Sequence, residues 1–154
     1  QPVLIVEIDE ASLKQIGQWP WPRNRTADLI DAIAANKPLA IGLDFYMPEP
    51  DQTSPARVAD NLPRGEEKLA SRLRTLPSHE QRLGQALARA PTVLGAAGFN
   101  FKTFTTSAGM RTAPLRVSGG DILPHLRRFP YVLASLPELQ AAARGQALMQ
   151  RMAG

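Results

Sequence analysis

The sequence predicts an α/β fold in which a central, mainly parallel sheet is flanked by helices as a sandwich. Residues 3–8 (Val-Leu-Ile-Val-Glu-Ile) and 39–43 (Leu-Ala-Ile-Gly-Leu) are short apolar segments typical of strands buried on both faces. Between them, Leu29, Ile30 and Ile33 mark one face of a helix. A strand, a crossover helix and a second strand form a right-handed parallel unit. We therefore expect the two strands to be adjacent and parallel.

Composition supports a single globular domain over residues 1–154. Apolar residues make up 44% of the 154 residues and charged residues 21%, as in a folded globular chain. No apolar run approaches the about 20 residues that span a bilayer. The chain has no cysteine, which excludes a disulfide scaffold, a thiolate zinc site and a cysteine nucleophile.

Charge is unevenly distributed along the chain. Residues 1–51 hold eight acids and four bases, a net charge of −4, whereas residues 52–154 hold six acids and fourteen bases, a net charge of +8. A basic excess can mark a nucleic-acid surface. Here the arginines are scattered, and the aromatic residues that would stack on bases do not alternate with them. The arginines are therefore expected to form a solvated basic surface. A nucleic-acid-binding module is the weakest alternative, and no nucleic-acid partner is expected.

Further elements are expected along the chain. A helical turn ends at Gly17, residues 48–64 form a long proline-rich surface loop, and a third strand begins at Thr92. Capping-box spacing predicts helix starts at Ser78 and Ser135. The remaining expected elements are a helical stretch at 69–76, a flexible hairpin at 103–116 and a short strand at 146–150.

Acidic, aromatic and basic side chains follow the first two predicted strands. Ligands gather at the carboxyl edge of parallel sheets. The candidate ligand-binding residues are accordingly Asp9, Glu10, Trp19, Trp21, Arg23 and Asp44.

Two interpretations of the strand-end acids are open. Asp9, Glu10 and Asp44 could hold Mg²⁺, which would make the chain a magnesium-dependent phosphotransfer or hydrolase domain. The favoured interpretation is that these carboxylates cap local turns and pair with a cation. Arg23 should then reach Asp9 or Asp44, and a partly buried Arg23 replaced by alanine should cost about 3 kcal/mol of stability.

No residue is assigned to catalysis, to a metal or to a cofactor. Packing is a commoner role for Trp19 and Trp21 than a ligand wall. His79 and His125 have no partner at metal-ligand spacing. The sequence also lacks a nucleophile elbow and a glycine-rich phosphate loop.

Several motifs together resemble a known family. Residues 8–13 (Ile-Asp-Glu-Ala-Ser-Leu), 17–23 (Gly-Gln-Trp-Pro-Trp-Pro-Arg), 40–45 (Ala-Ile-Gly-Leu-Asp-Phe) and 48–51 (Pro-Glu-Pro-Asp) are similar to the CHASE type-2 domain. The Trp-Pro-Trp-Pro-Arg string after an Ile-Asp strand is the most specific of them. Weaker support comes from residues 83–94 and 136–145.

The resemblance implies a sensory domain without chemistry of its own. Such a domain lies on the extracytoplasmic, periplasmic side of a bacterial membrane receptor. It relays a stimulus, either a small molecule or a protein, to a cytoplasmic output such as a nucleotide cyclase, a diguanylate cyclase or a kinase. The partners implied are the receptor's transmembrane helices and output domain, and a homodimer is open. Family members continue past the strand near Gly145, so we expect the last strands of the domain to be missing or incomplete.

The resemblance also suggests signalling by a change of shape. Residues 48–64 and 102–120 are rich in proline, glycine and polar residues and poor in large apolar residues. Such segments make few core contacts and have low local stability. We expect them to be the mobile surface.

Overall fold

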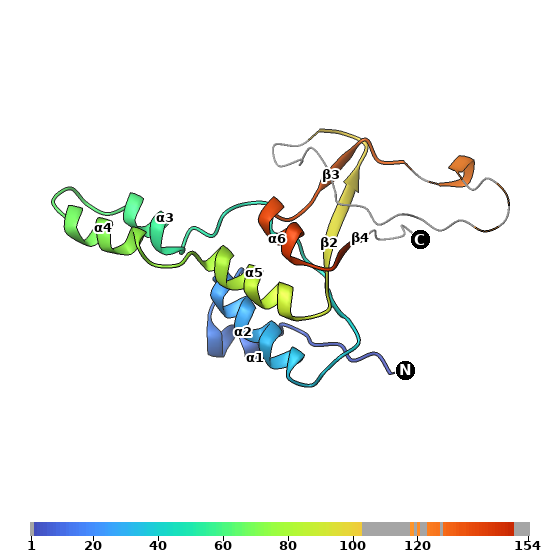
Figure 1. Ribbon diagram of the computed structural model, residues 1–154, viewed down its shortest axis with the longest axis horizontal. Helices are drawn as coiled ribbons and strands as arrows, with labels where there is room; N and C mark the ends of the chain where they lie inside the picture. The colour runs from blue at the N-terminus through green and yellow to red at the C-terminus, as the bar shows by residue number, and fades with distance from the viewer. Residues whose placement is uncertain (1, 103–117, 119, 121–122, 127, 150–154) are drawn as a thin grey trace.

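A computed structural model describes residues 2–102, 118, 120, 123–126 and 128–149 (Figure 1). The predicted hairpin at 103–116 and most of the predicted mobile segment 102–120 lie outside these residues. In chain order the elements are α1 (Glu10–Ile16), α2 (Arg23–Ala34), β1 (Ile41–Leu43), α3 (Pro55–Asp60), α4 (Glu67–Arg74), α5 (His79–Arg89), β2 (Thr92–Phe99), the 3-10 turn η1 (Leu123–His125), β3 (Tyr131–Leu133), α6 (Pro137–Ala142) and β4 (Gly145–Leu148).

Strand β2 is the centre of the described sheet. β1 pairs with it in parallel, with Ile41 opposite Thr92, and β4 also pairs with it in parallel, with Val93 opposite Gly145. Only β3 is antiparallel, pairing with the far end of β2. The expected α/β class with a mainly parallel sheet is therefore confirmed, as are the strands predicted near Thr92 and Gln146.

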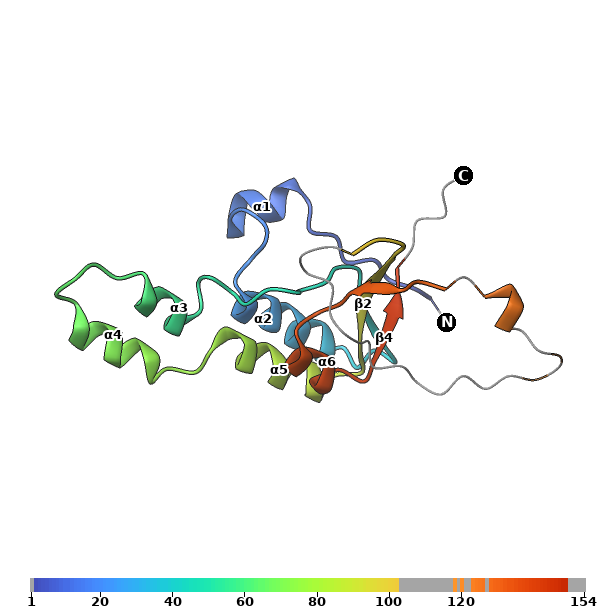
Figure 2. The ribbon, with the colours of Figure 1, turned by 90° about the horizontal axis from the view of Figure 1, so that it is seen from above.

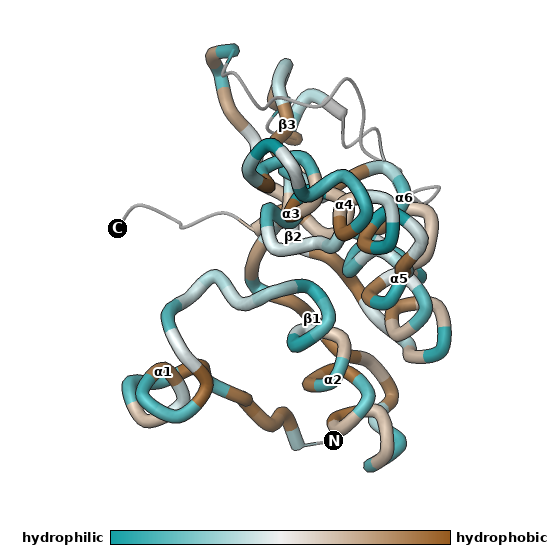
Figure 3. The backbone as a smooth tube through the Cα atoms, turned by 90° about the vertical axis from the view of Figure 1, so that its left-hand side faces the viewer, coloured by the Kyte–Doolittle hydropathy of each residue, from teal (hydrophilic) through white to brown (hydrophobic). Residues whose placement is uncertain are grey.

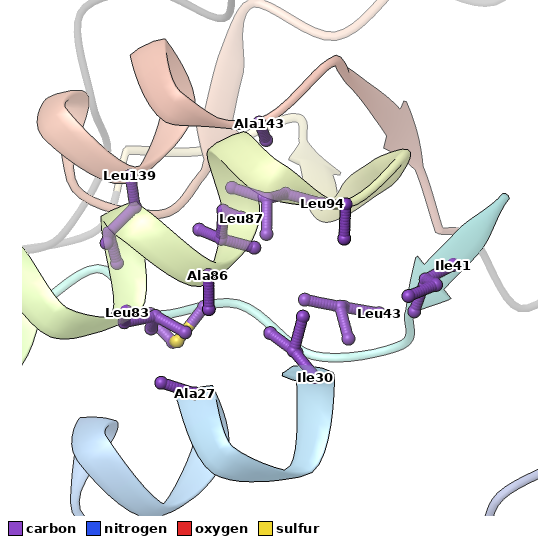
Figure 4. Close-up of a cluster of buried hydrophobic side chains, with 12 residues drawn as sticks. Ala27, Ile30, Ile41, Leu43, Leu83, Ala86, Leu87, Leu94, Leu139 and Ala143 are labelled. Atoms are coloured by element: carbon purple, nitrogen blue, oxygen red, sulfur yellow. The ribbon is translucent and has the colours of Figure 1, made fainter. Parts of the chain in front are cut away.

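The core lies between the sheet and the helices. α2 packs on α5, and α5 packs on α6. Their apolar side chains meet those of β1 and β2 in one buried cluster (Figure 4). The largest side chains of this cluster that are fully buried are Ile30, Met47, Leu83, Leu87, Leu94 and Leu139.

The prediction that residues 3–8 form a strand beside 39–43 is wrong. No strand is assigned to these residues, and β1 pairs with β2 instead. Val3, Leu4 and Ile5 are 90%, 87% and 83% exposed. Figure 3 shows this apolar segment running from the N-terminus to α1. Apolar β-branched residues indicate that a segment favours burial, but they do not specify the surface that buries it. Here the segment runs beside α1 and α2 and is not part of the sheet.

Helix ends follow local chemistry in two of three predicted cases. Gly17 ends α1 with φ 117°, a conformation that favours glycine. Ser78 forms the predicted capping box with Gln81 at the start of α5. The capping box predicted at Ser135 is wrong, because Leu136 is the N-cap of α6 and Ser135 Oγ instead accepts a hydrogen bond from Met47 N at 3.0 Å. The Ser135 hydroxyl therefore bonds to the chain after β1 and not to the first turn of α6.

Residues 55–76 form an arm rather than a loop. The predicted 48–64 loop contains α3, and the predicted helical stretch is α4. α3 and α4 pack on each other and extend away from the body of the domain along its longest axis (Figures 1 and 2).

Candidate functional site

The structure does not bring the predicted strand-end acids together. Asp9 is the N-cap of α1 and accepts hydrogen bonds from Ser12 N at 2.9 Å and Ser12 Oγ at 2.7 Å. These bonds lower the pKa of Asp9. Glu10 begins α1 and is exposed, and Asp44 is exposed just after β1. Within the described residues no three histidine, cysteine, aspartate or glutamate side chains are grouped closely enough to hold a metal ion, so the arrangement that the magnesium interpretation needs does not form.

Trp19 and Trp21 form the core of an aromatic turn. Their ring centroids lie 5.7 Å apart, and Trp19 also meets Phe45 edge-on at 5.2 Å. Trp21 is only 6% exposed, and its Nε1 donates to Gly17 O at 2.8 Å. Both rings therefore make packing contacts, and these contacts do not decide whether Trp21 also meets a ligand.

A cavity of about 310 Å³ lies between the N-terminal segment, α1 and α2. This size is at the lower end of small-molecule sites. Most of its wall is apolar, and the charged side chains that reach it are Glu7, Arg25 and Asp28. Asp28 pairs with Arg82 at 2.9 Å, whereas the Arg25 guanidinium has no hydrogen bond or ion pair within the described part of the chain. The apolar lining residues are Val6, Ile8, Ile16, Trp21 and Leu29.

Of the six predicted site residues, Trp21 alone lines this cavity. Arg23, two residues further on, belongs to a different cluster. The prediction that it pairs with Asp9 or Asp44 is wrong: Arg23 N donates to Asp51 Oδ2 at 2.7 Å, and Arg23 Nη2 donates to Glu49 O at 3.2 Å. Burial lowers the pKa of Arg23, and the carboxylates of Asp51, Glu80 and Glu49 oppose that shift.

Asp51 is the centre of a polar cluster, which we call the Asp51 clasp; its members are Arg23, Asp51, Thr53, Ser54, His79 and Glu80. Asp51 Oδ1 accepts from Thr53 N at 2.8 Å and from Thr53 Oγ1 at 2.7 Å. His79 Nδ1 lies 2.9 Å from Asp51 Oδ2. An ionised carboxylate only accepts hydrogen bonds, so Nδ1 carries the hydrogen of this pair.

Glu80 completes the clasp. Its Oε1 accepts from Asp51 N at 2.6 Å and its Oε2 accepts from Ser54 Oγ at 3.2 Å. Ser54 Oγ in turn accepts from His79 N at 3.0 Å. Ser54 precedes α3 and His79 begins α5, so the clasp fixes both ends of the arm to the first residue of α2. Of the clasp residues only Arg23 was a predicted site residue, although the Asp-x-Thr turn after Pro50 is a local signal for part of it.

Asp51 should make the free energy of unfolding depend on pH in the acidic range. Burial raises its pKa, but hydrogen bonds from Thr53, from Arg23 N and from His79 outweigh burial and lower the pKa below the ordinary 3.8. A carboxyl whose pKa is lower in the folded state contributes stability above its ordinary pKa and loses it as the pH falls toward the folded value.

We therefore expect the free energy of unfolding to fall as the pH drops below about 3.8, and to fall less steeply in Asp51→Asn. Urea unfolding measured across this pH range checks the prediction. Some slope should remain in the variant, because the guanidinium groups of Arg82 and Arg89 outweigh partial burial and lower the pKa of Asp31. Parallel wild-type and variant curves would contradict it.

No described helix is both long enough and apolar enough to cross a membrane. Comparison with curated proteins and with solved structures gives no match. The model of the CHASE2 domain matches residues 1–151, nearly the whole chain. This match confirms the resemblance carried by the Trp-Pro-Trp-Pro-Arg motif, and the chain therefore belongs to the CHASE2 family of extracellular sensory domains of receptors.

Proposed function

We propose that this chain is the extracytoplasmic input domain of a bacterial membrane receptor and that it performs no chemistry of its own. It senses a small molecule and relays its presence through the receptor's transmembrane helices to a cytoplasmic cyclase or kinase. The observation that carries the proposal is the cavity between the N-terminal segment, α1 and α2. The N-terminal segment, α1 and α2, which follow one another in the chain, all line it, so an occupant that contacts all three can favour one arrangement of them over another.

The chemistry of the wall indicates the class of ligand. Trp21, Leu29 and Ile16 offer an apolar surface, and Arg25 is a cation at its side without a partner among the described residues. An amphipathic anion, with an apolar body and one carboxylate or sulfonate, satisfies both. A guanidinium binds such a group through charge-assisted hydrogen bonds.

Anilinonaphthalene sulfonate has this chemistry and serves as the probe. Calorimetric titration should show that Arg25→Gln weakens its binding about tenfold, which corresponds to about 1.4 kcal/mol. Leu29→Trp should abolish binding because the larger ring fills the cavity. The matched controls are Arg57→Gln in the arm and Leu39→Trp, at a leucine that is 75% exposed, and both should bind as the wild type does. Wild-type affinity in Leu29→Trp would refute the cavity as the sensing site.

A further inference from the structure

The arm has little core of its own. α3 and α4 have six and eight residues, too few to be stable as isolated helices. Of their side chains only Ala59 and Ala70 are buried. Ordering each residue costs about 1–2 kcal/mol in backbone entropy, which two alanine methyl groups do not offset. Apart from the Asp51 clasp at its ends and the packing of α3 on α4, the arm therefore has little buried apolar surface, and a partner that covers it would add stability.

The arm exposes three apolar side chains to solvent. Val58, Leu69 and Leu76 are 38%, 44% and 50% exposed. The same segment is basic: its five bases and three acids give a net charge of +2, and Arg74 with Asp60 accounts for one neutralised pair at 2.8 Å. The bases are Arg57, Arg64, Lys68, Arg72 and Arg74, and the acids are Asp60, Glu66 and Glu67.

The N-terminal segment has the complementary character. Val3, Leu4, Ile5 and Val6 are all exposed, at 90%, 87%, 83% and 51%. Three acids and no base follow within four residues, at Glu7, Asp9 and Glu10. This surface offers apolar contact beside negative charge, where the arm offers apolar contact beside positive charge.

A single chain cannot join these two surfaces. Figures 1 and 2 show the arm at one end of the longest axis, with the N-terminus on the other side of the helical layer. We propose that the arm of one copy packs on residues 3–10 of a second copy. In a two-fold dimer each copy gives its arm and receives its partner's, so both contacts form at once. Together they cover four apolar side chains of the N-terminal segment and three of the arm in each copy.

The absence of cysteine from the sequence allows a direct test. Ile5→Cys and Leu69→Cys are made as separate single variants, one of them carrying a tag, and are mixed under mild oxidation. The mixed disulfide should form at least about tenfold faster than between Leu39→Cys and Leu69→Cys. Leu39 is the matched control because it is a similarly exposed leucine outside the proposed contact. Equal rates for the two pairs would overturn the proposal.

Sedimentation of the whole chain gives an independent readout. Leu69→Asp and Ile5→Asp should each weaken self-association at least about tenfold, which is about 1.4 kcal/mol. Ile5 lies outside every helix and strand, so its replacement cannot act by unfolding the arm. A wild-type chain that stays monomeric, or that binds anionic vesicles through Leu69 without self-associating, would refute the dimer. Titration of the sulfonate probe is a separate measurement: loss of the dimer with probe binding intact overturns only this proposal, although Val6 and Glu7 belong to both surfaces.

Discussion

Leu83→Ala should destabilise the domain by about 2–5 kcal/mol, the usual cost of removing a fully buried leucine. Leu83 is 0% exposed on α5 and belongs to the cluster that joins α2, α5 and β1 (Figure 4). The surrounding helices cannot collapse fully onto the space that its side chain leaves. Urea unfolding monitored by circular dichroism measures the loss.

The matched control for this prediction is Leu39→Ala. Leu39 is 75% exposed, so its replacement should change the free energy of unfolding by no more than about 0.5 kcal/mol. An equal loss in the two variants would mean that the α2–α5 interface is not the core of the protein.

Asp51→Ala should cost about 3 kcal/mol, although the residue lies in no helix or strand. The substitution leaves Arg23 N, Thr53 N and His79 Nδ1, all partly buried, without their acceptor, and it removes a carboxylate close to the half-buried Arg23 guanidinium. Each buried donor left unpaired costs about 1–3 kcal/mol. The free energy of unfolding at neutral pH is the measurement.

Asp60→Ala provides the comparison. Asp60 also pairs with an arginine, Arg74, but both side chains are about half exposed, at 53% and 51%. Exposed pairs contribute about 0.2–1 kcal/mol, so the loss should stay below about 1 kcal/mol. If Asp51→Ala costs no more than Asp60→Ala, the clasp does not hold the arm to the body.

The strands at 41–43 and 92–99 could be predicted from sequence because strands of a parallel sheet covered by helices are apolar along their length. α5 was equally predictable, since the Ser78 cap and the Leu83–Leu87 spacing are local signals. Residues 3–8 carry the same apolar signal as the strands but lie outside the sheet. An apolar composition indicates that a segment favours contact with other apolar groups, but it does not specify which part of the protein supplies them.

The candidate site was less predictable than the fold. Arg23 and the strand-end acids were paired on the expectation that they share one sheet edge, and that expectation depended on residues 3–8 being a strand. Asp51 and His79 meet across 28 positions, and no local pattern specifies such a pair. The family was easier to predict than the site. The Trp-Pro-Trp-Pro-Arg motif is specific to the family, whereas the spacing of apolar residues is shared by many folds.

Hydrogen bonds to the single carboxylate of Asp51 connect the chain beside the cavity to the arm. Trp21 lines the cavity, and Arg23, two residues later, donates its backbone N–H to Asp51. Asp51 in turn bonds to Thr53 and His79, which flank the two ends of the arm. Where two binding events share one such element, linkage requires their effects to be reciprocal. A ligand that strengthens self-association by a given factor must itself bind the dimer more tightly by that factor. If the chain senses a ligand and self-associates as proposed, the sensitivity of its receptor would then depend on how densely receptors are packed in the membrane.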